Sequence, residues 1–139
     1  MIRKFLLFLS FVAVPLISFS QDIIRVFPLE KRVVVTDPSQ GVKSHKGWGV
    51  FPKQEQPIRK INMYVHFACP DSMRCADWDY ADHILLERVG GVNGELKNWE
   101  IGSLITPYGG FFSKDWQFTW QTDVTEFALI LRDSCEINY

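Results

Sequence analysis

The chain has 139 residues, with 15 lysines and arginines against 16 aspartates and glutamates, and a formal net charge of −1. Hydrophobic residues make up 47% and aromatic residues 14%, a composition that is typical of a globular protein and excludes a disordered one. A slightly acidic chain lacks the positive electrostatic potential that attracts nucleic acids and anionic membranes, so neither is an expected partner.

The first twenty residues have the order of a secretory signal peptide. Arg3 and Lys4 form a short basic start, residues 5–19 are almost wholly apolar, and the small residue Ser20 closes the segment. The alternative is an uncleaved anchor, but the apolar run is short for a membrane span and contains Pro15. The pattern therefore favours cleavage.

Removal of residues 1–20 leaves a mature chain, 21–139, with 13 basic residues against 16 acidic ones. We expect this chain to be secreted or periplasmic, without membrane contact once the signal peptide has been cleaved. Its length suffices for one domain with its own core.

Short strands separated by turn residues are predicted along the mature chain. Residues 61–69 alternate apolar and polar side chains, and the glycine-rich stretch 90–94 favours a hairpin. The predicted strands are Ile23–Phe27, Arg32–Thr36, a short one at 50–51 within the irregular segment 41–57, and 61–69, 83–89, 99–106, 116–124 and 136–139. This spacing predicts an all-β protein, an antiparallel β-sandwich of the jelly-roll type.

Two further patterns lie near the end of the chain. Asp123 and Glu126 fit the start of a short helix of one or two turns that continues to Leu131. On the preceding strand, Trp116 and Trp120 share a face with Phe118, which favours a stripe of core residues over a platform for sugars.

The chain has three cysteines: Cys69, Cys75 and Cys135. The first two enclose turn-forming residues, and outside the cytosol such a pair is expected to form a disulfide. A zinc site and free thiols are the alternatives, but four zinc ligands are not found nearby. Cys135 is left over, which suggests that a part of the protein is missing.

The second cysteine leads into a group of acidic and aromatic residues. In an extended chain, Asp77 and Asp79 would share one face and Trp78 and Tyr80 the other. Two close carboxylates repel, so the pKa of one should rise, more so if Trp78 or Tyr108 shields the pair from water. A carboxylate of this kind suits the hydrolysis of amide or glycosidic bonds. The alternative is that the aspartates cap the main chain and the aromatic residues lie in the core.

Three stretches, CPDSMRCADWDY, WEIGSLITPYG and DVTEFALIL, occur in this order between about Phe51 and Tyr139. Together they resemble the N-terminal domain of the bacterial peptide-N-glycosidase F family. The resemblance implies a jelly-roll sandwich, the N-terminal one of two such domains. It also implies amidase activity on the bond between an asparagine side chain and the first N-acetylglucosamine of an N-linked glycan.

The resemblance assigns roles to individual positions. The principal catalytic aspartate of the family corresponds to Asp79, and the family disulfide to Cys69–Cys75, with no metal or cofactor. Expected contacts with the glycopeptide come from Trp78, Tyr80, Asp77 and Tyr108. The chain departs from the family at Tyr80, where an arginine is usual, and at Gly109-Gly110, where a large aromatic residue is common.

Catalysis in the family also uses two glutamates. One lies just beyond the position that matches Tyr139, and the other lies in a second β-sandwich domain. We therefore expect this chain to be the N-terminal part of a longer enzyme, or a truncated product, that is inactive alone and has the second domain as its partner.

Two other functions are weighed against the amidase. A non-catalytic carbohydrate-binding or adhesion sandwich would keep the fold without the chemistry, and Tyr80 favours it. A copper-dependent monooxygenase would use related sandwiches, but copper requires clustered histidines. His45, His66 and His83 are far apart in the sequence, and only His66 and His83 are expected to face each other across adjacent strands.

Overall fold

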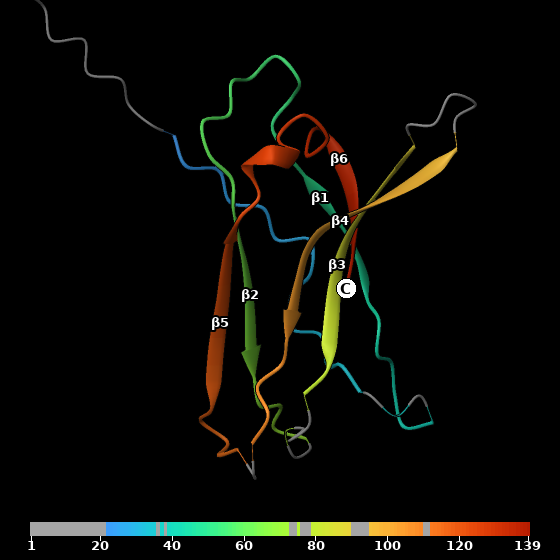
Figure 1. Ribbon diagram of the computed structural model, residues 1–139, viewed down its shortest axis with the longest axis vertical. Coiled ribbons are helices and arrows are strands. Elements are labelled where there is room, and N and C mark those ends of the chain that lie inside the picture. The colour runs from blue at the N-terminus through green and yellow to red at the C-terminus, as the bar shows by residue number, and fades with distance from the viewer. Residues whose placement is uncertain are drawn as a thin grey trace, which may run out of the picture.

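The computed structural model describes residues 22–35, 37, 39–72, 75, 79–89, 95–109 and 112–139 (Figure 1). Within these ranges the fold is all-β and contains no α-helix. The elements are β1 (Lys46–Val50), β2 (Asn62–Ala68), β3 (Ala81–Val89), β4 (Leu96–Ile105), β5 (Gln117–Asp123), the 3₁₀ turn η1 (Thr125–Phe127) and β6 (Ser134–Asn138). The expected signal peptide lies outside the described residues. In the described ranges, no helix has the length and apolarity needed to cross a membrane.

The strands form two antiparallel sheets, one of four strands in the order β1-β6-β3-β4 and one of two strands, β2-β5. The pairs are nested along the chain: β3 pairs with β4, β2 with β5, and β1 with β6. In Figure 1 the two-stranded sheet lies to the left of the other four strands. Residues that are distant in the sequence are thereby brought together, with Lys46 opposite Asn138.

The core lies between the two sheets. Its buried residues come mostly from the four-stranded sheet and include Ile84, Leu86, Ile101, Leu104, Cys135 and Ile137. The two-stranded sheet contributes Met63, Val65 and Trp120, as the alternation along β2 predicts. Gly102 allows the sheets to approach, because a Cβ atom there would lie 2.6 Å from Met63 Cε and 3.3 Å from Trp120 Cη2.

The prediction of strands at Ile23–Phe27 and Arg32–Thr36 is wrong for the described residues, which form no strand between 22 and 35. This segment instead packs on β1, where Cβ atoms at Gly47 and Gly49 would overlap Pro28 and Val26. An apolar run has strand propensity, but a strand also needs a partner to complete its hydrogen bonds. The short strand expected at 50–51 is β1, which begins earlier and ends at Val50.

The helix expected after Asp123 is a single 3₁₀ turn, η1. Asp123 does not cap it, since Val124 occupies the N-cap position. The carboxylate of Asp123 instead accepts hydrogen bonds from Thr125 N at 3.0 Å and Thr125 Oγ1 at 2.5 Å. Both donors bond the same carboxylate oxygen, and local bonds of this kind favour a turn over a longer helix.

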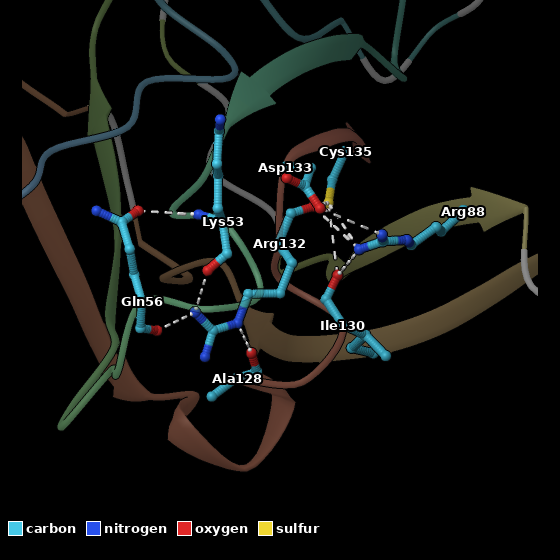
Figure 2. A network of polar contacts seen from close by, with 8 residues as sticks. All are labelled: Lys53, Gln56, Arg88, Ala128, Ile130, Arg132, Asp133 and Cys135. Carbon is cyan, nitrogen blue, oxygen red and sulfur yellow. Dashed lines mark hydrogen bonds and ion pairs between the residues drawn. The ribbon is translucent and has the colours of Figure 1, made fainter.

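Two arginines hold the turn that leads into β6 (Figure 2). Arg132, only 5% exposed, donates hydrogen bonds to the carbonyl oxygens of Ala128 at 2.6 Å, Lys53 at 2.9 Å and Gln56 at 2.6 Å. These bonds connect the 53–56 loop to the turn after η1. Because the guanidinium is buried and would be costly to leave without partners, these bonds stabilise both segments.

The second arginine, Arg88, reaches the same turn from β3. It donates to the carbonyl oxygens of Ile130 at 2.8 Å and Arg132 at 2.9 Å, with Cys135 Sγ 3.9 Å away. Cys135 is 1% exposed and carries a free thiol. A cysteine in the core packs as a small apolar residue. Burial in the core therefore accounts for a thiol without a disulfide partner.

Glu87 is a buried carboxylate on the face of β3 opposite to the core residue Leu86. Lys46 Nζ lies 2.5 Å from one of its oxygens, and Asn138 Nδ2 lies 3.1 Å from the other. The hydrogen bond from Lys46 lowers the pKa of Glu87, so the carboxylate is ionised in neutral solution. Both oxygens of the Glu87 carboxylate thus accept hydrogen bonds from residues of the same chain.

Candidate functional site

The disulfide between Cys69 and Cys75 is formed, with the two Cα atoms 5.3 Å apart, which confirms that prediction. Cys69 directly follows β2, and its N–H donates to the carbonyl oxygen of Trp116 at 3.3 Å. Its sulfur lies 3.1 Å from the carbonyl oxygen of Ser113. A disulfide sulfur has no hydrogen to donate, so this is a close contact that packs the ring against the segment before β5.

Asp79 lies two residues before β3, the strand that begins at the lower end of the sandwich in Figure 1. Its carboxylate is exposed and has no hydrogen bond or ion pair among the described residues. The following residue, Tyr80, donates its N–H to Thr106 Oγ1 at 2.8 Å and accepts from Thr106 N at 3.0 Å. These two bonds extend the β3–β4 pairing by one residue and fix the main chain next to Asp79.

The other predicted site residues divide into two groups. Tyr80 is 39% exposed and Tyr108 is 70% exposed, so both aromatic side chains are accessible from solvent. They lie on the two chain segments that Thr106 and Tyr80 bond together. Asp77 and Trp78 lie outside the described residues. Their expected arrangement on opposite faces therefore stays a prediction.

A hollow of about 330 Å³ adjoins the disulfide. Its lining residues are Cys69, Pro70, Asp71, Ser72, Cys75, Phe112 and Lys114. Phe112 stacks on Trp116 with ring centroids 4.5 Å apart, which holds it in place. Sequence reasoning did not single out Phe112 or Lys114, because their approach to the cysteine ring depends on the pairing of β2 with β5.

A second titratable group, Asp82, faces inward on β3, three residues after Asp79. Tyr139 Oη donates to its carboxylate at 2.8 Å. Burial raises the pKa of Asp82 above its ordinary value, although this hydrogen bond acts in the opposite direction. Burial also raises the pKa of Tyr139, so its hydroxyl stays protonated. No local sequence pattern predicts this pair, because the two residues are 57 positions apart.

The histidines are not arranged as the copper hypothesis expected. His66 lies on β2 and contacts Thr119 Oγ1 at 2.8 Å, whereas His83 lies on β3 and contacts Glu100 at 3.1 Å. These strands belong to different sheets, so the expectation that His66 and His83 face each other across adjacent strands is wrong. Among the described residues, no three histidine, cysteine or acidic side chains are grouped closely enough to hold a metal ion.

The aromatic stripe predicted on β5 is only partly a core stripe. Trp120 packs against the core, but Phe118 is 40% exposed and Trp116 precedes the strand. Trp116 instead stacks on Phe112 beside the disulfide. The strand thus contributes one tryptophan to the core and leaves the other near the candidate site.

Comparisons of this chain with protein families, with curated proteins and with solved structures found no match. The resemblance to the peptide-N-glycosidase F family therefore rests on the three sequence stretches alone. The geometry around Asp79 is an independent observation that a functional proposal has to explain.

Proposed function

We propose that this chain is the N-terminal part of a secreted amidase that removes N-linked glycans from glycoproteins, with Asp79 as its catalytic carboxylate. The observation that carries the proposal is the state of Asp79. It is an exposed carboxylate without a partner among the described residues, next to a main chain fixed by the Tyr80–Thr106 bonds. A carboxylate engaged in main-chain capping would not have this free bonding capacity.

We further infer that the fold is a reduced jelly roll. The nested pairs β1–β6, β2–β5 and β3–β4 are what results when one long antiparallel hairpin is rolled into two facing sheets. The family to which the sequence stretches point is built from sandwiches of this type. The strand order therefore supports the resemblance without depending on it.

In the proposed reaction, water adds to the side-chain amide carbon of a glycosylated asparagine, and the bond from this carbon to nitrogen breaks. Asp79 would take a proton from the water, and a proton would pass to the leaving nitrogen. The products are a glycosylamine and an aspartate in the peptide. The exposed rings of Tyr80 and Tyr108 would offer apolar faces to the sugar.

The proposed partner is a second β-sandwich domain that supplies further carboxylates. A general base contributes rate only when the substrate is held and the leaving group is stabilised. The described residues place no second unpartnered carboxylate beside Asp79, so we expect the 21–139 domain alone to release no glycan.

The test is deglycosylation of a glycopeptide by the full-length gene product, compared between wild type and Asp79→Asn. We expect the variant to lose about a thousandfold in turnover, the usual range for a general base. Asp115→Asn, which changes another exposed aspartate near the same end, is the matched control and should keep its activity. Equal turnover of wild type and Asp79→Asn would reject the amidase.

The second candidate function is a non-catalytic carbohydrate-binding sandwich. Tyr80, where the family has an arginine, favours it because an exposed aromatic ring binds the C–H faces of sugars. Glycan binding that is weakened by Tyr80→Ala, with no turnover by the full-length product, would support this alternative.

A further inference from the structure

β4 is an outer strand with an open edge. It is ten residues long and hydrogen-bonds only to β3 among the described residues. Thr106 N donates to Tyr80 O, which identifies this pair as a hydrogen-bonded one. In an antiparallel pair the bonding alternates from residue to residue, so Ser103 and Ile105 direct their N–H and C=O groups to the open edge.

A groove of about 290 Å³ lies along this edge, between β4 and β5. Ser103 and the indole of Trp120 contribute to its lining, and Glu100, Asp123 and Glu126 contribute carboxylates. The groove therefore combines main-chain donors and acceptors, an aromatic surface and acidic side chains.

The groove carries negative charge. Three carboxylates and no lysine or arginine are among its lining residues. Hydrogen bonds from Thr125 lower the pKa of Asp123, so this carboxylate stays ionised over a wide pH range. Two basic side chains lie against these carboxylates, with Lys60 3.6 Å from Asp123 and His83 3.1 Å from Glu100. Glu126 has no ion pair among the described residues.

We propose that this groove binds an extended, basic stretch of the substrate polypeptide as an additional strand on the edge of β4. Strand addition would use the outward main-chain groups of Ser103 and Ile105, and the carboxylates would select lysine or arginine side chains. Trp120 would contact their aliphatic stems or cationic heads. The occupant is identified by charge complementarity and by the open strand edge.

The position of the groove connects it with the proposed catalytic residue, and in this respect the inference depends on the proposed function. β4 runs from the groove to Thr106, which is bonded to Tyr80 next to Asp79. At about 3.3 Å per residue, Ser103 and Thr106 are about 10 Å apart along the strand. A peptide on this edge would therefore lead toward the Asp79 carboxylate.

The experiment measures binding of the 21–139 domain to non-glycosylated ten-residue peptides by titration calorimetry at low and high salt. One peptide contains lysines in a strand-forming sequence, and the other has glutamates at the same positions. We expect the basic peptide to bind at least tenfold more tightly and its affinity to fall as salt increases. Equal affinity for both peptides would overturn the inference.

Variants separate the contribution of the carboxylates to peptide binding from that of the main-chain groups at the open edge of β4. Glu126→Gln should weaken binding of the basic peptide about threefold, whereas Glu95→Gln, an exposed acid outside the groove, should not change it. Ser103→Pro removes an N–H at the open edge but no bond to β3, so it should fold and lose at least tenfold in affinity. Folded Ser103→Pro with unchanged affinity would contradict strand addition. If this variant does not fold, Glu126→Gln and the salt dependence decide.

Two further measurements keep the proposals distinct. Asp79→Asn should bind the basic peptide as the wild type does, so retained binding with unchanged turnover would reject only the amidase. Sedimentation of the domain without peptide examines a second copy as the occupant. A dimer that Ser103→Pro dissociates would assign the edge to self-association and overturn the peptide site.

Discussion

The two ends of the sandwich use polar groups in opposite ways. At one end, the buried Arg132 and the partly buried Arg88 donate to carbonyl oxygens of their own chain (Figure 2). At the other end, Asp79 is exposed and has no partner among the described residues. The difference indicates which polar groups maintain the fold and which have bonding capacity left for a ligand.

The strongest test of this contrast is Arg132→Met. It removes the donor to three carbonyl oxygens at the closed end of the sandwich. We expect the free energy of unfolding of the domain to fall by about 3 kcal/mol, since three hydrogen bonds from a buried guanidinium are lost at about 1 kcal/mol or more each. Urea denaturation at neutral pH measures the change.

Arg59→Met is the matched control, because Arg59 is exposed and makes no bond among the described residues. Its effect should stay within about 0.5 kcal/mol, and so should that of Asp79→Asn. If Asp79→Asn destabilised the domain as much as Arg132→Met, the assignment of the two ends to fold and function would be wrong.

Loss of the disulfide should have the next largest effect. The double variant Cys69→Ser, Cys75→Ser opens a ring whose cysteines are 6 positions apart. The chain-entropy relation gives about 2 kcal/mol for a ring of this size. Denaturation of the variant, and of the wild type with and without a reductant, checks this value. Equal stability of oxidised and reduced wild type would show that the ring does not stabilise the open end.

Thr106→Val tests the bonds beside Asp79. The substitution keeps the shape of the side chain but removes the oxygen that accepts from Tyr80 N at 2.8 Å. We expect a loss of about 1 kcal/mol in unfolding free energy. If Asp79 is catalytic, turnover by the full-length product should fall as well. A loss of stability with full turnover would mean that Thr106 does not position Asp79.

The smallest expected effect depends on pH and concerns Asp82. Burial raises its pKa in the folded state above the ordinary value of 3.8. Its contribution to stability is therefore fully present below pH 3.8 and is lost as the pH rises through the folded-state pKa. Asp82→Asn cannot ionise, so it should gain stability relative to wild type between pH 3 and pH 7. A constant difference across this range would contradict the role of burial.

The sequence predicted the fold class and most of the strands, because alternation along β2 and the glycine-rich stretch before β4 are local patterns. Predictions from the sequence were wrong where tertiary contacts determine the local structure. Residues 22–35 have strand-like composition but no partner strand, and Asp123 bonds Thr125 instead of starting a longer helix. Local propensity cannot reveal the absence of a partner.

For the candidate site, the sequence predicted the Cys69–Cys75 disulfide and drew attention to Asp79. It missed the Asp82–Tyr139 hydrogen bond and the groove between β4 and β5, since both depend on how the sheets face each other. It did not predict that Cys135 is buried, because a count of cysteines contains no information on burial.

The nested strand pairs also affect how the protein is made. β3 and β4 are near each other in the sequence and can pair early, but β1 waits for β6, which supplies its only strand partner among the described residues. Strands that are far apart in the sequence pair slowly, so the pair of β1 with β6 is expected to form last. Until β6 has been synthesised, Leu86 lacks the strand that contains its partner Ile137, so we expect the nascent chain to expose apolar surface that chaperones bind.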